Sequence, residues 1–144
     1  MRSPELGADY VRRAKARLTA VDALHAAESW ADVVRESQEV VELALKGLLR
    51  IAGIEPPRIH DVSEVLIAEK SRLPRAVQPH VESLAAGSRT LRRDRELAFY
   101  GAEDLTPSGF YTRDDATAAR DIARQTVAAV EPHAQGTRPR LGEG

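Results

Sequence analysis

Basic side chains gather in one short stretch of the chain, which reads RTLRRDRELAFYG. This stretch holds Arg89, Arg92, Arg93 and Arg95, and Tyr100 follows them. A guanidinium group forms paired hydrogen bonds with a phosphate, and an aromatic ring stacks on a nucleobase. The residue types at this helix end therefore predict a nucleotide- or phosphate-binding site that consists of Arg95, Tyr100 and Arg92.

The position of Arg95 along its helix supports this prediction. When the segment is projected at about 100° per residue, Ser88 and Arg95 fall in the middle of an apolar face and Arg92 falls at its border. The apolar residues of that face are Val77, Val81, Leu84, Leu91 and Phe99. An arginine is almost never fully buried without a partner, because removing its charge from water is costly. Arg95 should therefore face a groove or a dimer seam, unless the helix end leaves the core.

The arginines also have a purely structural interpretation. Positive charges near the C-terminal end of a helix are favoured by its dipole, and Asp94 and Glu96 can pair with them on the surface. This interpretation suits Arg93, which lies on the outward side of the helix. It does not account for Arg95, whose position on the apolar face speaks against a surface role.

The remaining residues predict no catalytic group, no cofactor and no metal site. The four histidines, His25, His60, His80 and His133, show no repeated short spacing of the kind that metal sites use. We expect His60 to pack beside Asp61 at a helix entry and His25 to be a core histidine with a satisfied ring. The chain has no cysteine, which excludes disulfides, thiolate ligands and thiol nucleophiles.

Composition points to one small globular domain. The chain has 144 residues, of which 42% are hydrophobic and 30% charged, and its net charge is -1, so any nucleic-acid binding needs a local basic patch. We predict a single helical domain over residues 1–131 and a disordered tail over residues 132–144, which is polar and rich in breakers. No apolar run approaches the ~20 residues that a membrane span requires, and the first residues, MRSPELGADY, lack the apolar core that is typical of a signal peptide. We therefore expect a cytoplasmic protein.

Hydrophobic periodicity predicts an all-α fold with five helices. The first covers about residues 8–27, and the second starts at Trp30, carries a broad stripe of Val and Leu, and stops at Gly53. The third covers about residues 62–70, and the fourth begins near Pro74 and runs to about residue 99. Short connections between amphipathic helices indicate antiparallel neighbours, and hence an up-down bundle.

Two helix starts carry capping signals. Asp61 is a predicted N-cap with Glu64 three residues later, and Thr112 with Asp115 has the same spacing at the start of the fifth helix. We expect Pro132 to end that last helix. The stripes of small apolar residues, together with Arg95 inside one of them, also favour a homodimer.

The order of these blocks resembles the HEPN domain family. The similar stretches are SWADVVRESQEVVELALKGLLRIAGIEPP, IHDVSEVL, RRDRELAFYG and YTRDDATAARDIA, and they span nearly the whole chain. The resemblance implies a five-helix bundle that usually dimerises. Many members are RNases of toxin–antitoxin-like systems, whose active site is an arginine followed after four to six residues by a histidine. Others pair with a minimal nucleotidyltransferase.

This sequence departs from the nuclease pattern of the family. Four residues separate Arg95 from Tyr100, so a tyrosine stands where the resemblance places histidine. A phenol with a pKa near about 10 is a poor general base at neutral pH. The sequence therefore predicts a nucleotide- or RNA-binding HEPN protein of a toxin–antitoxin-like or nucleotidyltransferase-partner module, without nuclease activity of its own. Two alternatives remain open: a metal-independent RNase that uses Arg95 with a group other than histidine, and a helical adaptor with no ligand.

Overall fold

A computed structural model describes residues 3–58, 61–100 and 107–134, with the backbone alone for residues 3, 95–100, 107 and 108. The long helices are α1 (Ser3–Ala26), α2 (Trp30–Ile51), α4 (Val81–Tyr100) and α6 (Arg113–Ala134), and the short ones are α3 (Val62–Ala68) and α5 (Pro107–Phe110). Two 3₁₀ turns, η1 (Lys70–Arg72) and η2 (Gln78–His80), lie between α3 and α4. Within these residues every regular element is helical, which confirms the predicted all-α class.

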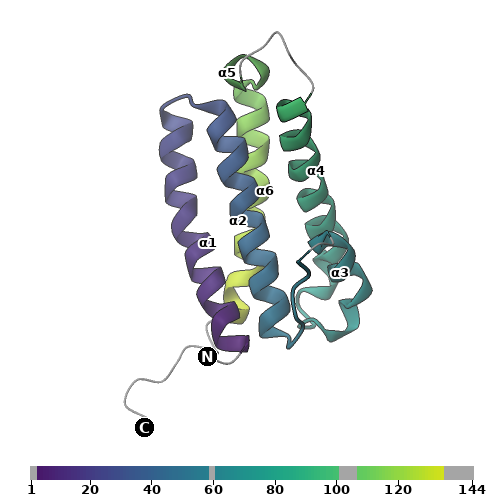
Figure 1. Ribbon diagram of the computed structural model, residues 1–144. Helices are drawn as coiled ribbons and strands as arrows, with labels where there is room; N and C mark the ends of the chain where they lie inside the picture. The colour runs from purple at the N-terminus through teal and green to yellow at the C-terminus, as the bar shows by residue number, and fades with distance from the viewer. Residues whose placement is uncertain (1–2, 59–60, 101–106, 135–144) are drawn as a thin grey trace, which may run out of the picture.

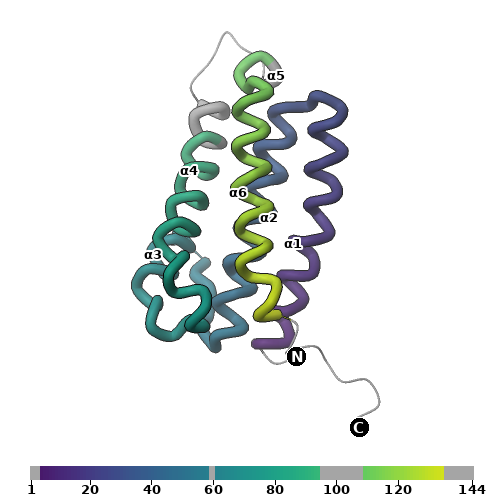
Figure 2. The backbone as a smooth tube through the Cα atoms, turned by 180° about the vertical axis from the view of Figure 1, so that it is seen from behind, coloured from purple at the N-terminus to yellow at the C-terminus, as the bar shows by residue number. Residues whose placement is uncertain are grey.

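The four long helices alternate in direction, as the prediction of an up-down bundle requires (Figure 1). α2 lies at the centre, where it packs against α1, α6 and α4, and α3 packs mainly against α4. Seen from behind, α6 runs between α4 on one side and α1 on the other (Figure 2). The bundle therefore places the pair α3 and α4 on the side away from α1.

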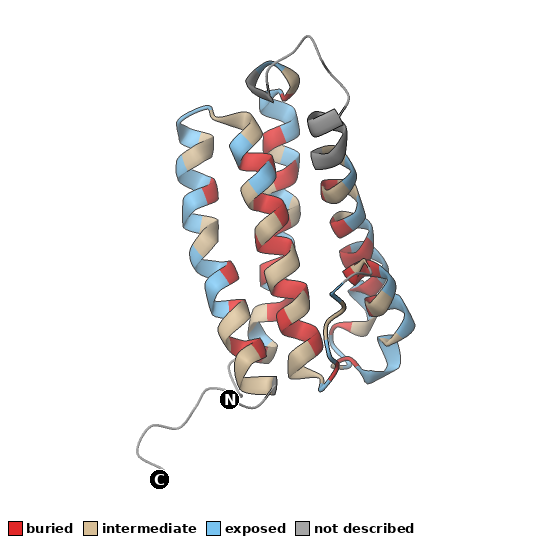
Figure 3. Ribbon diagram, viewed as in Figure 1, coloured by how far each residue is buried: buried red, intermediate tan, exposed pale blue. Residues whose placement is uncertain are grey.

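The core is built around α2, as its apolar stripe predicts. Leu45, Leu48 and Leu49 have no exposed surface, and Val33, Val40 and Ala44 are equally buried. Figure 3 shows buried positions along the whole length of α2. Aliphatic side chains thus supply the burial that the few aromatic residues do not, and burial of this kind is the main driving force for folding.

Two glycines let α1 and α2 approach until their backbones touch. A Cβ atom added to Gly47 would lie 2.7 Å from the carbonyl oxygen of Gly7, and one added to Gly7 would lie 2.6 Å from the carbonyl oxygen of Gly47. Such separations are too short for any real Cβ atom. Glycine is therefore required at both positions by the distance between the helices.

Both predicted N-caps are present. Asp61 has an extended backbone conformation, and its carboxylate accepts a hydrogen bond from the backbone amide of Ser63. Asp115 accepts one from the amide of Thr112 at 2.8 Å, and the hydroxyl of Thr112 accepts one from the amide of Asp115 at 3.2 Å. This reciprocal pair starts α6. The predicted stop of α2 is also confirmed, since Gly53 follows the helix with a φ of +78°.

The predicted start of the fourth helix is wrong. Pro74 begins a turn, in which the amides of Val77 and Gln78 donate to its carbonyl oxygen, and α4 starts only at Val81. The reason is Pro79, which the prediction neglected. Its ring would clash with the carbonyl group of Arg75 in a continuous helix, and it has no amide to donate.

Pro132 does not end the last helix, contrary to the prediction. α6 continues through Pro132 to Ala134, whose side chain is buried, so burial holds the final turn together despite one missing amide donor. The helix therefore includes the first three residues of the predicted tail, and residues 135–144 lie outside the described residues.

Two other bounds also differ from the prediction. α1 starts at Ser3 rather than near residue 8. The short α5 lies where the prediction had only a loop.

Candidate functional site

A groove lies between α4 and the start of α3. It has a volume of about 530 Å³ and is lined by Asp61, Ala86, Arg89, Thr90, Arg92 and Arg93. Five of these residues come from two successive turns of α4, and Asp61 comes from the N-cap of α3. The groove thus brings three guanidinium groups and one carboxylate together.

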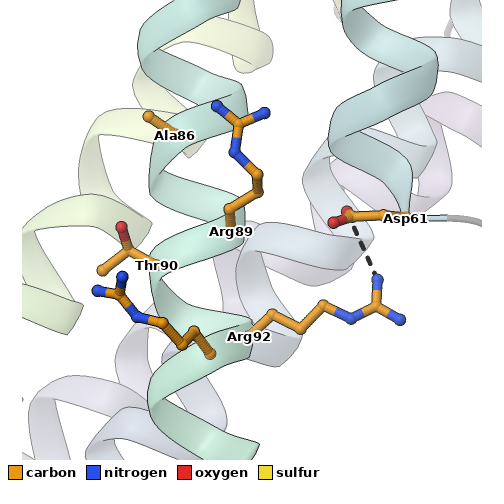
Figure 4. A pocket seen from close by; sticks show the side chains of 6 residues that line it. Asp61, Ala86, Arg89, Thr90 and Arg92 are labelled. Carbon is orange, nitrogen blue, oxygen red and sulfur yellow. Dashed lines mark ion pairs between the residues drawn. The ribbon is translucent and has the colours of Figure 1, made fainter.

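Arg92 reaches from α4 to α3. One of its terminal nitrogens, Nη1, lies 3.5 Å from Oδ1 of Asp61, and the two side chains are 38% and 24% exposed. The same oxygen accepts the hydrogen bond from the amide of Ser63, at 3.0 Å. Figure 4 shows Arg92 and Arg89 on the side of α4 that faces Asp61. Arg92, predicted at the border of the apolar face, therefore lines the groove.

Arg89 and Arg93 are held less by ion pairs than Arg92 is. Arg89 is exposed and has no ion-pair partner among the described residues, while Arg93 makes only a long contact of 3.8 Å with Asp94. Four residues of α-helix rise about 6 Å, so the side chains of Arg89 and Arg93 leave the helix about one turn apart along α4. Weakly paired arginines on an open surface are available to an anionic ligand.

The predicted site is only partly described. α4 continues as a helix through Arg95 and Tyr100, but both side chains lie outside the described residues. The apolar face on which the sequence places Arg95 is present in the preceding two turns of α4, since Ser88 and Leu91 are 5% and 1% exposed. Arg95 and Tyr100 therefore stay a prediction, and among the described residues that line the groove Arg92 is the one that was predicted.

Sequence reasoning missed three charged members of the groove, Arg89, Arg93 and Asp61. Arg89 and Arg93 have the i,i+4 spacing that puts side chains on one helix face, and this signal could have been used. Asp61 was recognised as a cap but not as a partner of Arg92. No short-range pattern in the sequence predicts that α3 packs beside α4.

The ring of His25 has a hydrogen-bond partner, as predicted, but the residue is half-buried and does not belong to the core. Its Nε2 lies 2.9 Å from the hydroxyl of Thr117, and its ring packs edge-on against Trp30 with centroids 5.0 Å apart. The pKa of His25 lies below its ordinary value of 6.5, because desolvation disfavours the charged ring and nearby guanidinium groups repel it. These groups belong to Arg120, Arg113 and Arg124, and the carboxylate of Asp22 acts in the opposite direction.

The described residues offer no candidate metal site. The described residues contain no group of three or more His, Asp or Glu side chains that could hold a metal ion. His60 lies outside the described residues. Desolvation raises the pKa of Asp94 on α4, and the backbone carbonyl of this residue accepts a hydrogen bond from the hydroxyl of Tyr111 at 2.9 Å.

A model of the HEPN domain matches residues 8–133, which include every residue of the groove. The chain belongs to the HEPN domain family. Comparisons with curated proteins and with solved structures gave no significant match. None of the described helices of this HEPN domain is long and apolar enough to cross a membrane.

Proposed function

We propose that this HEPN domain binds the phosphate groups of a nucleotide or an RNA in the groove between α3 and α4. It would act as a non-catalytic component of a toxin–antitoxin-like module or as the partner of a minimal nucleotidyltransferase. The observation that carries the proposal is the gathering of Arg89, Arg92 and Arg93 around one groove. Since the whole chain has a net charge of -1, this concentration of positive charge is local.

The composition of the groove favours binding over cleavage. Histidine is the side chain that most readily transfers protons near neutral pH, and none is among the described residues that line the groove. Tyr100, rather than histidine, follows Arg95 at the family's spacing. Arginine and threonine side chains can hold a phosphate but are poor groups for removing a proton from an attacking hydroxyl.

Binding is tested with labelled single-stranded RNA and with ATP, titrated into the full chain. Arg89→Ala or Arg92→Ala should weaken binding about ten- to a hundredfold, the effect expected for a lost hydrogen bond to a charged group. For RNA, each variant should also reduce the slope of log K against log salt by about 0.7. Arg12→Ala is the matched control, because it removes one exposed guanidinium from α1, outside the groove.

The predicted residues at the end of α4 form a separate arm of that experiment. If Arg95→Ala abolishes binding while Arg89→Ala and Arg92→Ala have no effect, the site lies at Arg95 and Tyr100 and the groove is wrong. If wild-type protein binds neither ligand, the adaptor alternative replaces the proposal.

Cleavage is tested by incubating the purified protein with total and structured RNA without added metal. We expect no appreciable cleavage. Cleavage that disappears in Arg95→Ala would overturn the non-catalytic proposal and favour the RNase alternative.

Assembly belongs to the same proposal. We expect a homodimer, with a mass near twice 15.8 kDa by light scattering, and a persistent monomer at high micromolar concentration would refute it. Co-purification from the native host should recover a minimal nucleotidyltransferase. Recovery of the HEPN protein alone from a lysate that contains such an enzyme would exclude that partner.

A further inference from the structure

The groove contains a carboxylate that a simple phosphate site does not need. Asp61 lines the same groove as three arginines, and its charge opposes the binding of any anion there. Its Oδ1 is already occupied, since it accepts from the amide of Ser63 at 3.0 Å and lies 3.5 Å from Arg92. Its Oδ2 accepts no hydrogen bond from any described residue. A partly exposed acceptor therefore remains available beside the guanidinium groups.

We propose that Asp61 accepts a hydrogen bond from a ribose hydroxyl of the ligand whose phosphate the arginines hold. This inference rests on the proposed function and names its ligand class, a ribose phosphate. An ionised carboxylate can only accept hydrogen bonds, and a phosphodiester group has none to donate. The 2′-hydroxyl of a ribose supplies a donor close to the phosphate, and it is the group by which proteins distinguish RNA from DNA.

The arrangement of the groove fits a ribose with its neighbouring phosphate. Arg89 and Arg92 lie on the face of α4 that looks toward Asp61, so an anion on the arginines would have its neighbouring sugar near the carboxylate (Figure 4). The volume of about 530 Å³ is within the usual range for small-ligand sites. A carboxylate beside phosphate-binding groups also recognises ribose hydroxyls in dinucleotide-binding folds.

A competing explanation is that Asp61 serves only as the cap of α3 and the partner of Arg92. In that case its charge would weaken the binding of ribose and deoxyribose ligands equally. The ratio of the two affinities therefore separates the explanations, whereas either affinity alone does not.

The test compares RNA with DNA of the same sequence, and AMP with dAMP, by titration into the full chain. Wild-type protein should prefer the ribose form about tenfold, a ratio that corresponds to about 1.4 kcal/mol. Asp61→Ser keeps a good helix cap but is too short to reach the ligand, and its ratio should fall below about twofold. Asp61→Asn keeps the size of the side chain and should also lower the ratio. Glu64→Gln removes an exposed carboxylate of α3 outside the groove and should leave the ratio unchanged.

The outcomes also separate this inference from the function on which it rests. If no nucleic acid or nucleotide binds, the proposed function itself fails. Equal binding of ribose and deoxyribose forms, or a preference that both Asp61 variants retain, overturns the role of Asp61 alone. A preference seen with both AMP and RNA identifies a mononucleotide unit as sufficient, and one seen with RNA alone identifies a strand.

Discussion

Replacing Gly47 with alanine should destabilise the protein, although alanine is normally the better helix former. In an exposed helix interior the change stabilises by about 1 kcal/mol. Here the new Cβ would lie 2.7 Å from the carbonyl oxygen of Gly7, 2.8 Å from Cγ2 of Val11 and 3.1 Å from Cβ of Tyr10. The first contact is with backbone, so α1 and α2 must move apart. Overpacking of this kind costs about 1–3 kcal/mol.

Because three close contacts arise together, we expect the upper end of that range, and a net loss of about 2 kcal/mol after the gain in helix propensity. For a chain of this size the midpoint of thermal unfolding should fall by about 5–10 °C. Urea unfolding followed by circular dichroism measures the free energy directly.

Gly87→Ala is the matched control, since Gly87 also lies inside a long helix. Its Cβ would meet only the side chain of Ile122, with the closest atom, Cγ2, at 2.9 Å. A methyl group can shift where a backbone cannot, so the stability should change by less than about 1 kcal/mol. Should Gly47→Ala prove as stable as the wild type, the close approach of α1 and α2 would be refuted.

Three further substitutions test other features of the fold. Thr112→Ala should lower the free energy of unfolding by about 1 kcal/mol through loss of the reciprocal cap, and unchanged stability in urea would contradict it. Tyr111→Phe should cost about 1 kcal/mol by removing the hydrogen bond to the carbonyl of Asp94, again measured in urea. Since the pKa of His25 is lowered in the folded state, the unfolded chain takes up its proton first, and stability should fall as the pH drops through 6.5. His25→Gln should flatten this part of the stability–pH profile, and an unchanged profile would show that another group is responsible.

The parts of the fold that the sequence predicts are those set by neighbouring residues. The stripe of α2, the cap at Asp61 and the pair Thr112 and Asp115 each depend on residues within a few positions, and each is present. The start of α4 was misplaced because two prolines compete for that role, and Pro79 decides it.

The groove depends on contacts that sequence periodicity does not record. Arg92 and Asp61 are 31 positions apart, and only the packing of α3 against α4 brings them together. The contact between Gly7 and Gly47 was missed for the same reason, since each glycine alone looks like a weak position in a helix.

The sharing of one carboxylate oxygen links the first turn of α3 to the groove. Oδ1 of Asp61 is divided between the amide of Ser63 and the guanidinium of Arg92. A ligand that draws Arg92 away leaves the amide as the main partner of that oxygen, so the first turn of α3 frays less often. The exchange of the Ser63 amide hydrogen with solvent should then slow, while that of buried Val41 stays unchanged. The rate of hydrogen exchange at the Ser63 amide should therefore show whether a ligand occupies the groove, without a label on the ligand.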